Sequence, residues 1–326
     1  MQNLNQKNKT SKLNNQNMSD LSLIKKLRET TGCGIVHCKD ALSANDNDFE
    51  KSIDWLRKKG LSSASKKSGR ITSEGLIAVL TLENKASIVE VNSETDFVAR
   101  NQKFQEFVAN ITKSAINFEN IEDLKASKYN NGNISIDEEL KNQIGVIGEN
   151  INIRRLTTLK VNHGTIVSYI HNAVVPNKMG KIGVLVAFES NAQKDKIETL
   201  GKQIAMHIAA AKPDTLSIES VDPAKLQREI EILKEQARST GKPESIIEKM
   251  MEGRIKKYYE EVVLLEQNFV MDDKLKIKDL LNNLAKQENT NVNISAFKLF
   301  ILGEGIEKKE LDFANEVASI TGNIKS

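Results

Sequence analysis

The sequence has little of what marks membrane, secreted or metal-binding proteins. Its two cysteines, Cys33 and Cys38, are spaced for neither a disulfide framework nor the CxxC pairs of zinc sites, and we interpret them as reduced thiols. The longest apolar runs, such as residues 182–188, are far shorter than the roughly 20 residues that a membrane-spanning helix needs. The N-terminus lacks the apolar segment of a secretory signal and the arginines of a transit peptide. We therefore expect a soluble, cytoplasmic protein with no membrane partner.

Sequence motifs for catalysis are missing as well. No GxxxxGK[ST] or GxGxxG run offers a phosphate-binding loop, and no GxSxG run offers an activated serine. The four histidines lack the HExxH spacing of zinc enzymes. A net charge of +3 is too small to argue for nucleic-acid binding by itself. These absences favour a binding protein that is not an enzyme, and we expect no cofactor, no metal site and no DNA partner.

The length and composition predict more than one folded unit. With 39% hydrophobic and 28% charged residues, the 326-residue chain can bury more than one core, and length alone suggests about two or three domains. Residues 1–17 are almost all polar and are expected to be a disordered leader, with Met18 as the candidate true start. Residues 18–60 then carry the apolar spacing of three short helices, with N-cap residues at 46–48 and a C-cap at Gly60.

Two features near the N-terminus could meet a partner. The Gly32-Cys33-Gly34 kink would bring backbone close to a partner, although a plain tight turn is the commoner explanation. Residues 61–74 are predicted to be a basic linker, because no acid interrupts the run that contains Arg57, Lys58, Lys59, Lys66, Lys67 and Arg70. No aromatic residues are interleaved for base stacking, so a solvated linker is favoured over an RNA contact.

The next part of the chain predicts an α+β core of two sheet-plus-helix units. The first unit, residues 75–150, has strands at 75–82 and 86–92 and helices at 101–117 and 134–147. The stripe of the 101–117 helix consists of Phe104, Phe107, Val108, Ile111 and Ala115. The second unit, residues 151–302, has a helix at 195–211 and strands at 153–161, 166–171, 182–188 and 292–302.

Two helical additions complete the predicted architecture. Residues 223–265 carry two apolar stripes on either side of a Ser239–Pro243 turn, which is typical of an antiparallel helical hairpin with a coiled-coil seam. Such a hairpin either stiffens its domain or forms an interface. Residues 303–326 begin with a glycine-rich turn and continue into an amphipathic helix at 310–320, a C-terminal helical module.

The stretch from Glu90 to Arg100 stands at the centre of this plan. An alternating strand runs into a helix that is expected to begin at Asp96 and Phe97. A large ring at a helix start, beside a carboxylate, is either a hydrophobic staple next to an N-cap or a group offered to a partner. Spacing alone favours the staple.

Five segments, in order, resemble the signature segments of the bacterial elongation factor Ts family. They are Thr31-Gly-Cys-Gly-Ile-Val-His-Cys-Lys-Asp-Ala-Leu42, Glu90-Val-Asn-Ser-Glu-Thr-Asp-Phe-Val-Ala-Arg100, Ile147-Gly-Glu-Asn-Ile-Asn-Ile-Arg-Arg155, Ala205-Met-His-Ile-Ala-Ala210 and Gly303-Glu-Gly-Ile-Glu307. The resemblance covers nearly everything from about residue 18 onward. It implies a ubiquitin-associated-like N-terminal domain, two α+β subdomains with a protruding hairpin, and a guanine-nucleotide exchange factor for the GTPase elongation factor Tu.

The resemblance also implies roles for particular residues. The segment that the family uses to dislodge magnesium from the GTPase corresponds to Thr95, Asp96, Phe97 and Val98. Further contacts with the GTPase are implied for Thr31, Gly32, Gly34, Arg100 and His171. The hairpin at 223–265 is expected to serve self-association or contacts with other partners.

The chain departs from the family pattern at two places. Residues 172–178, beside His171, look like a short insertion, and His37 stands where the family usually has an acidic residue.

Two other functions are also open. An RNA- or ribosome-associated protein would use the basic linker, and a structural assembly protein would use the hairpin seam.

Overall fold

A computed structural model describes residues 21–239 and 243–307, and the N-terminal part of this range is helical. The three helices expected there are present, at residues 21–31, at α2 (Ile35–Ala44) and at α3 (Phe49–Lys67). Asp48 caps α3 by accepting a hydrogen bond from the Lys51 N–H, as the sequence indicates. The helices enclose a small core that consists of Leu27, Cys33, Cys38, Ala41, Leu42 and Leu56.

Helix α3 is longer than its sequence suggests. It passes through Gly60 and ends at Lys67, so the expected C-cap at Gly60 is wrong and the expected linker is helical over its first half. The physical reason is tertiary packing. Gly60 faces Gly145 of α6 (Ile136–Ile147), and Ala64 is buried against the core beneath α6. Because glycine has no side chain, Gly60 lets α3 and α6 cross closely. It does not end the helix.

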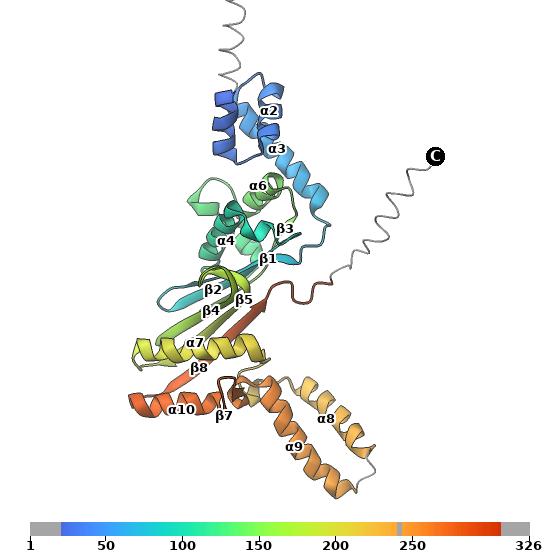
Figure 1. The fold of residues 1–326 in the computed structure, drawn as a ribbon, viewed down its shortest axis with the longest axis vertical. Coiled ribbons are helices and arrows are strands. Elements are labelled where there is room, and N and C mark those ends of the chain that lie inside the picture. The colour runs from blue at the N-terminus through green and yellow to red at the C-terminus, as the bar shows by residue number, and fades with distance from the viewer. Residues whose placement is uncertain (1–20, 240–242, 308–326) are drawn as a thin grey trace, which may run out of the picture.

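The α+β class is confirmed, and one antiparallel sheet runs through both predicted units (Figure 1). Its strands are β1 (Glu74–Thr81), β2 (Lys85–Ser93), β3 (Ile151–Lys160), β4 (Gly164–Val175), β5 (Met179–Ser190) and β8 (Val292–Ile301). The order is β3-β2-β1-β5-β4, and β8 also pairs with β5. The two halves join where Ile77 pairs with Gly180 and Ala78 with Met179. Residues 172–178 lie in the β4–β5 hairpin, where the register shifts between Ala173 and Val175.

Each half of the sheet buries one face under helices. The first half packs against α4 (Gln102–Ala115), α5 (Ile121–Ala126) and α6. The second half packs against α7 (Lys194–Ala211) and α10 (Ile277–Glu288). The opposite faces of the two halves meet in a third core, which contains Ile77, Ile88, Ile166, Ile170 and Leu185. Because both faces are buried, β1 and β5 are apolar along most of their length.

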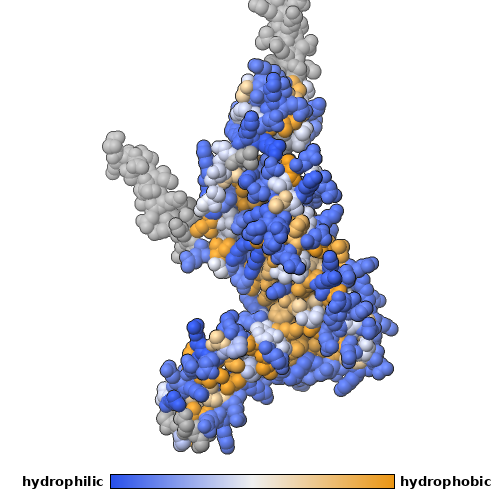
Figure 2. Space-filling model, turned by 180° about the vertical axis from the view of Figure 1, so that it is seen from behind, coloured by the Kyte–Doolittle hydropathy of each residue, from blue (hydrophilic) through white to orange (hydrophobic). Residues whose placement is uncertain are grey.

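A helical hairpin projects from the second half, as predicted. It consists of α8 (Pro223–Arg238) and α9 (Glu244–Val262), which lie side by side (Figure 1). The seam contains Ala237, Ile247 and Met251. Hydrophobic residues also lie on the surface of this arm among hydrophilic ones (Figure 2). A short hairpin of β6 (Asn268–Phe269) and β7 (Asp272–Lys276) follows α9.

Some sequence predictions lie outside the described residues. These are the leader at 1–17 with its candidate start at Met18, the tip of the hairpin turn at 240–242 and the C-terminal helix at 310–320.

Candidate functional site

The residues Ser93 to Phe97 form a turn between β2 and α4, which we call the 93–97 turn. The Ser93 hydroxyl donates to the Thr95 carbonyl at 2.9 Å. A single 3-10 turn, Val98–Arg100, follows, and α4 then begins at Gln102. Its N-cap is Asn101, whose side chain accepts hydrogen bonds from the Lys103 and Phe104 N–H groups. The prediction that the helix begins at Asp96 and Phe97 is therefore wrong, because Asn101 is the N-cap.

Phe97 points into solvent. Its side chain is 80% exposed, whereas Val98 and Ala99 are buried in the core beneath α4. The staple interpretation is thus wrong, because a stapled ring would be covered by the helix. The Gln105 side chain donates to the Ala99 carbonyl at 2.9 Å, which fixes the backbone just after the ring. The turn therefore presents an aromatic ring, with Asp96 exposed beside it, from an anchored segment.

Two glutamates hold the other side of the 93–97 turn. Glu149 accepts hydrogen bonds from both the N–H and the hydroxyl of Thr95, at 2.9 and 2.6 Å. Glu94 accepts from the Asn150 N–H at 2.6 Å. The Asn150 amide in turn donates to the Arg70 carbonyl at 2.8 Å. The link between α6 and β3 is thereby bonded to the turn.

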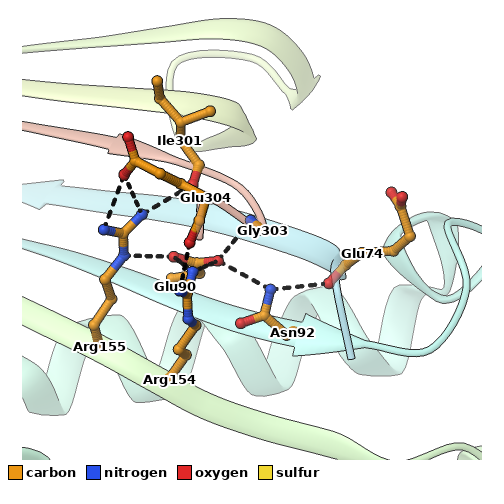
Figure 3. Close-up of polar contacts among 8 residues, drawn as sticks. All are labelled: Glu74, Glu90, Asn92, Arg154, Arg155, Ile301, Gly303 and Glu304. Atoms are coloured by element: carbon orange, nitrogen blue, oxygen red, sulfur yellow. Dashed lines mark hydrogen bonds and ion pairs between the residues drawn. The ribbon is translucent and has the colours of Figure 1, made fainter. Parts of the chain in front are cut away.

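A buried carboxylate ties the same strand to the far end of the chain (Figure 3). Glu90 of β2 is fully buried and accepts hydrogen bonds from Arg154 at 3.0 Å and Arg155 at 2.5 Å on β3. Its third partner from another element is the Gly303 N–H, at 2.8 Å, just after β8. A buried charge needs such partners to offset lost hydration. We call these residues the Glu90 clasp. The only sequence signal for it was one acid inside an apolar strand.

The predicted contact residues of the N-terminal domain lie beside α4. Gly32 has a φ of +74°, and a side chain there would overlap the Lys103 ammonium group. The Thr31 hydroxyl donates to the Leu27 carbonyl at 2.7 Å and ends the first helix. Thr31 and Lys103 both line a cleft of about 700 Å³ between this domain and the helices α4 and α6. Gly34 precedes α2 and has open space around it.

Comparison with known proteins identifies the family. A protein-family sequence model described as "Elongation factor TS" matches residues 94–304. The chain belongs to the elongation factor Ts family. Among its relatives, "Elongation factor Ts" of Rhodospirillum centenum is 51% identical over 94% of this chain and 100% of the relative. The Mesorhizobium japonicum protein of the same name is 48% identical over 91% and 96%, and that of Rickettsia felis 47% identical over 93% and 99%. The chain is thus related to translation elongation factors along most of its length.

The remaining predicted contacts of this elongation factor Ts family member are separate from the 93–97 turn or only border it. Arg100 is exposed and ends the 3-10 turn. His171 is exposed on β4, where its ring Nδ1 lies 3.0 Å from the Tyr169 hydroxyl. Among the described residues, no hydrogen bond or ion pair joins His171 to the turn. His37 is exposed on α2 and lines the cleft.

Sequence reasoning missed one exposed apolar pair. Ile35 and Val36, at the start of α2, are 56% and 69% exposed, whereas the buried residues of this helix are Cys38, Ala41 and Leu42. The sequence gives no signal for them, because consecutive apolar residues of this helix can also be buried, as Ala41 and Leu42 are. They directly follow Gly34, one of the predicted contacts.

The described residues offer no metal centre and no membrane span. In residues 21–239 and 243–307, no group of three or more His, Cys, Asp and Glu side chains is placed to hold a metal ion. No helix in the same ranges is long and apolar enough to cross a membrane.

Proposed function

We propose that this elongation factor Ts family member promotes the release of GDP from elongation factor Tu. The family membership and the resemblance of residues 90–100 to the family's exchange segment support the partner. The observation that carries the mechanism is the exposed ring of Phe97, held on an anchored turn. In this proposal the protein changes the equilibrium of a GTPase and catalyses no covalent chemistry, and it acts in the cytoplasm without a cofactor.

The proposed mechanism is a wedge coupled to magnesium loss. A GTPase holds GDP through backbone N–H groups and a magnesium ion. Burial of the Phe97 ring between helices of the GTPase contributes about 1.5–3 kcal/mol and favours a shape with a displaced metal site. Asp96, exposed beside the ring, supplies a hydrogen-bond acceptor next to the pocket that the ring enters. By thermodynamic reciprocity, nucleotide binding weakens the hold of the factor by the same ratio. Binding of GTP to the GTPase therefore releases the factor.

A second contact strengthens the wedge in this proposal. Gly32 touches Lys103, so the N-terminal domain lies beside the first turn of α4, soon after Phe97. The exposed Ile35 and Val36 give that domain an apolar surface for the same GTPase. Arg100 and His171 are proposed as further contacts, since both are exposed. Two separate anchors raise the effective concentration of the ring at its pocket.

The test is the rate of fluorescent GDP release from elongation factor Tu at fixed magnesium concentration. The wild-type chain is expected to accelerate release strongly, and Asp96→Ala/Phe97→Ala to lose most of the acceleration. Leu82→Ala is the matched control, because Leu82 is also an exposed apolar residue near a turn, at the opposite end of β1 from the 93–97 turn. It should match the wild type. If the wild-type chain fails to accelerate release, the exchange function is wrong.

The RNA-binding alternative has weaker support. The basic run lies largely on α3. Lys59 lies 3.9 Å from Asp40 and stacks over the Trp55 ring. The positive charge of Lys59 thus already interacts with groups of the same domain, which leaves it less available for RNA. If RNA binding were the function, affinity should fall steeply with salt and on neutralising Lys58, Lys59, Lys66 and Lys67.

The hairpin is proposed to mediate self-association. Ile232 and Ile246 on its two helices are exposed, while the seam between the helices is already filled by Ala237, Ile247 and Met251. The exposed isoleucines therefore remain for contact with a second copy.

A further inference from the structure

The pairing of β2 with β3 continues past its last backbone pair through side chains. The final pair in the ladder is Ser93 opposite Ile151. In the same register, the next residues opposite each other are Glu94 and Asn150, then Thr95 and Glu149. Each of these pairs is joined by a glutamate carboxylate that accepts a backbone N–H from the opposite segment. The carboxylates thus replace the backbone carbonyls where the strands separate.

The Glu149 carboxylate is well placed to fix the conformation of Thr95. Its two oxygens bind two donors of one residue, the N–H at 2.9 Å and the hydroxyl at 2.6 Å. Hydrogen bonds to an ionised acceptor are stronger than neutral ones, and two of them define an orientation. Gly148, with a φ of 86°, ends α6 just before Glu149. The segment that carries Glu149 is itself fixed, because the next residue, Asn150, is buried and its side-chain amide donates a hydrogen bond to the Arg70 carbonyl.

We infer that Glu149 is a positioning residue for Phe97 in the exchange reaction. The inference rests on the proposed function. Glu149 fixes the backbone two residues before the ring, and burial of Val98 and Ala99 fixes the backbone just after it. With Glu149 in place, the ring and Asp96 are presented in one arrangement before the GTPase arrives. Without it, the turn must be ordered during binding, which weakens every interaction that the ring makes in the complex.

A double-mutant cycle tests whether Glu149 acts through Phe97. GDP release from elongation factor Tu is measured with the wild type, Glu149→Ala, Phe97→Ala and the double variant. Glu149→Ala is expected to lower the catalysed rate about tenfold in the wild-type background and less than about twofold in the Phe97→Ala background. Thr95→Val, which removes only the hydroxyl donor, should lower it about threefold. An equal effect of Glu149→Ala in both backgrounds would overturn the inference.

Glu189 provides a matched control. It also accepts hydrogen bonds from two loop donors, the N–H groups of Asn162 and His163, both at 3.1 Å. These bonds hold the turn between β3 and β4 instead of the 93–97 turn. Glu189→Ala should therefore leave the catalysed rate within about twofold of the wild type, although it also removes a carboxylate that accepts two hydrogen bonds from a loop. A tenfold loss in this control would assign the Glu149 effect to general loosening and would contradict the inference.

Hydrogen exchange of the isolated chain gives a readout that does not need the GTPase. Glu149→Ala is expected to speed amide exchange about tenfold in residues 94–101, and to leave residues 85–92 of β2 unchanged. Unchanged exchange in 94–101 would show that Glu149 does not order the turn. The hydrogen-exchange result can be obtained even if the wild-type chain fails to accelerate GDP release from elongation factor Tu. In that case the proposed function is wrong, but the ordering role of Glu149 stands.

Discussion

Gly145 of α6 lies so close to Gly60 of α3 that a methyl group on Gly145 would sit 2.7 Å from the Gly60 Cα. The two helices therefore cross with backbone against backbone. This crossing attaches the N-terminal helices to the core, since α3 belongs to the N-terminal domain and α6 packs on the sheet.

The two glycines should respond oppositely to alanine. A methyl group on Gly60 would lie 3.9 Å from its nearest neighbours on α6, the Gly145 Cα and the Lys141 carbonyl, so Gly60→Ala should stabilise the helical chain by about 0.5–1 kcal/mol. Gly145→Ala should destabilise it by about 1–3 kcal/mol, because the backbone of α3 must move. Urea unfolding followed by circular dichroism measures both. A stabilising Gly145→Ala would contradict the close crossing.

The Glu90 clasp should contribute strongly to stability. Glu90→Gln removes a buried charge that faces Arg154 and Arg155, and it should destabilise the chain by about 3 kcal/mol. Glu304→Gln is the control. Glu304 also pairs with Arg155, at 3.2 Å, but it is half exposed, so its loss should cost at most about 1 kcal/mol. Urea midpoints compare the two variants, and equal small losses would show that the clasp is not a stabilising unit.

Strong local patterns made part of this fold predictable. The stripe of α4 was expected from its helical spacing, and Phe104, Phe107, Val108, Ile111 and Ala115 are all buried. The hairpin of α8 and α9 was likewise predicted from two apolar stripes around a turn. In both cases the deciding information is the repeat of apolar residues three or four positions apart within one continuous segment.

Interactions between distant residues were not predictable in this way. The Glu90 carboxylate and the Gly303 N–H are 213 residues apart, and nothing local marks them as partners. Gly60 was predicted as a helix end because glycine is common there, but its contact with Gly145 decides its role. At Phe97, helix-start residues favoured a staple, whereas Asn101 provides the actual cap and leaves the ring exposed.

Self-association through the hairpin should depend on its exposed isoleucines. Ile232→Lys/Ile246→Lys places charge where a second copy would bury apolar surface, so it should abolish association. Light scattering of the wild type is expected to give a mass that rises above 36.4 kDa with concentration, and the variant should stay at 36.4 kDa. Leu82→Lys, an equal change at an exposed residue outside the hairpin, should behave as the wild type. A wild type that remains at 36.4 kDa would contradict the proposal.

His207 should make stability depend on pH near neutrality. It is fully buried on α7, accepts a hydrogen bond from the Val270 N–H at Nδ1, and therefore donates through Nε2 to the Gln267 side-chain oxygen. Burial lowers the pKa of His207 below its ordinary value of 6.5, while the bond to Gln267 acts in the opposite direction. The unfolded chain thus takes up a proton at a higher pH than the folded chain.

The resulting change in stability has a definite sign. The contribution of neutral His207 is fully present above about pH 6.5, decreases as the pH falls below that value, and levels off below the lowered folded pKa. His207→Gln removes the titrating group, so its urea midpoint should fall less than that of the wild type between pH 7.5 and pH 5.5. Leu82→Ala, at an exposed residue with no titrating side chain, should keep the wild-type pH dependence. Identical pH profiles for His207→Gln and the wild type would show that protonation of His207 does not limit stability in this range.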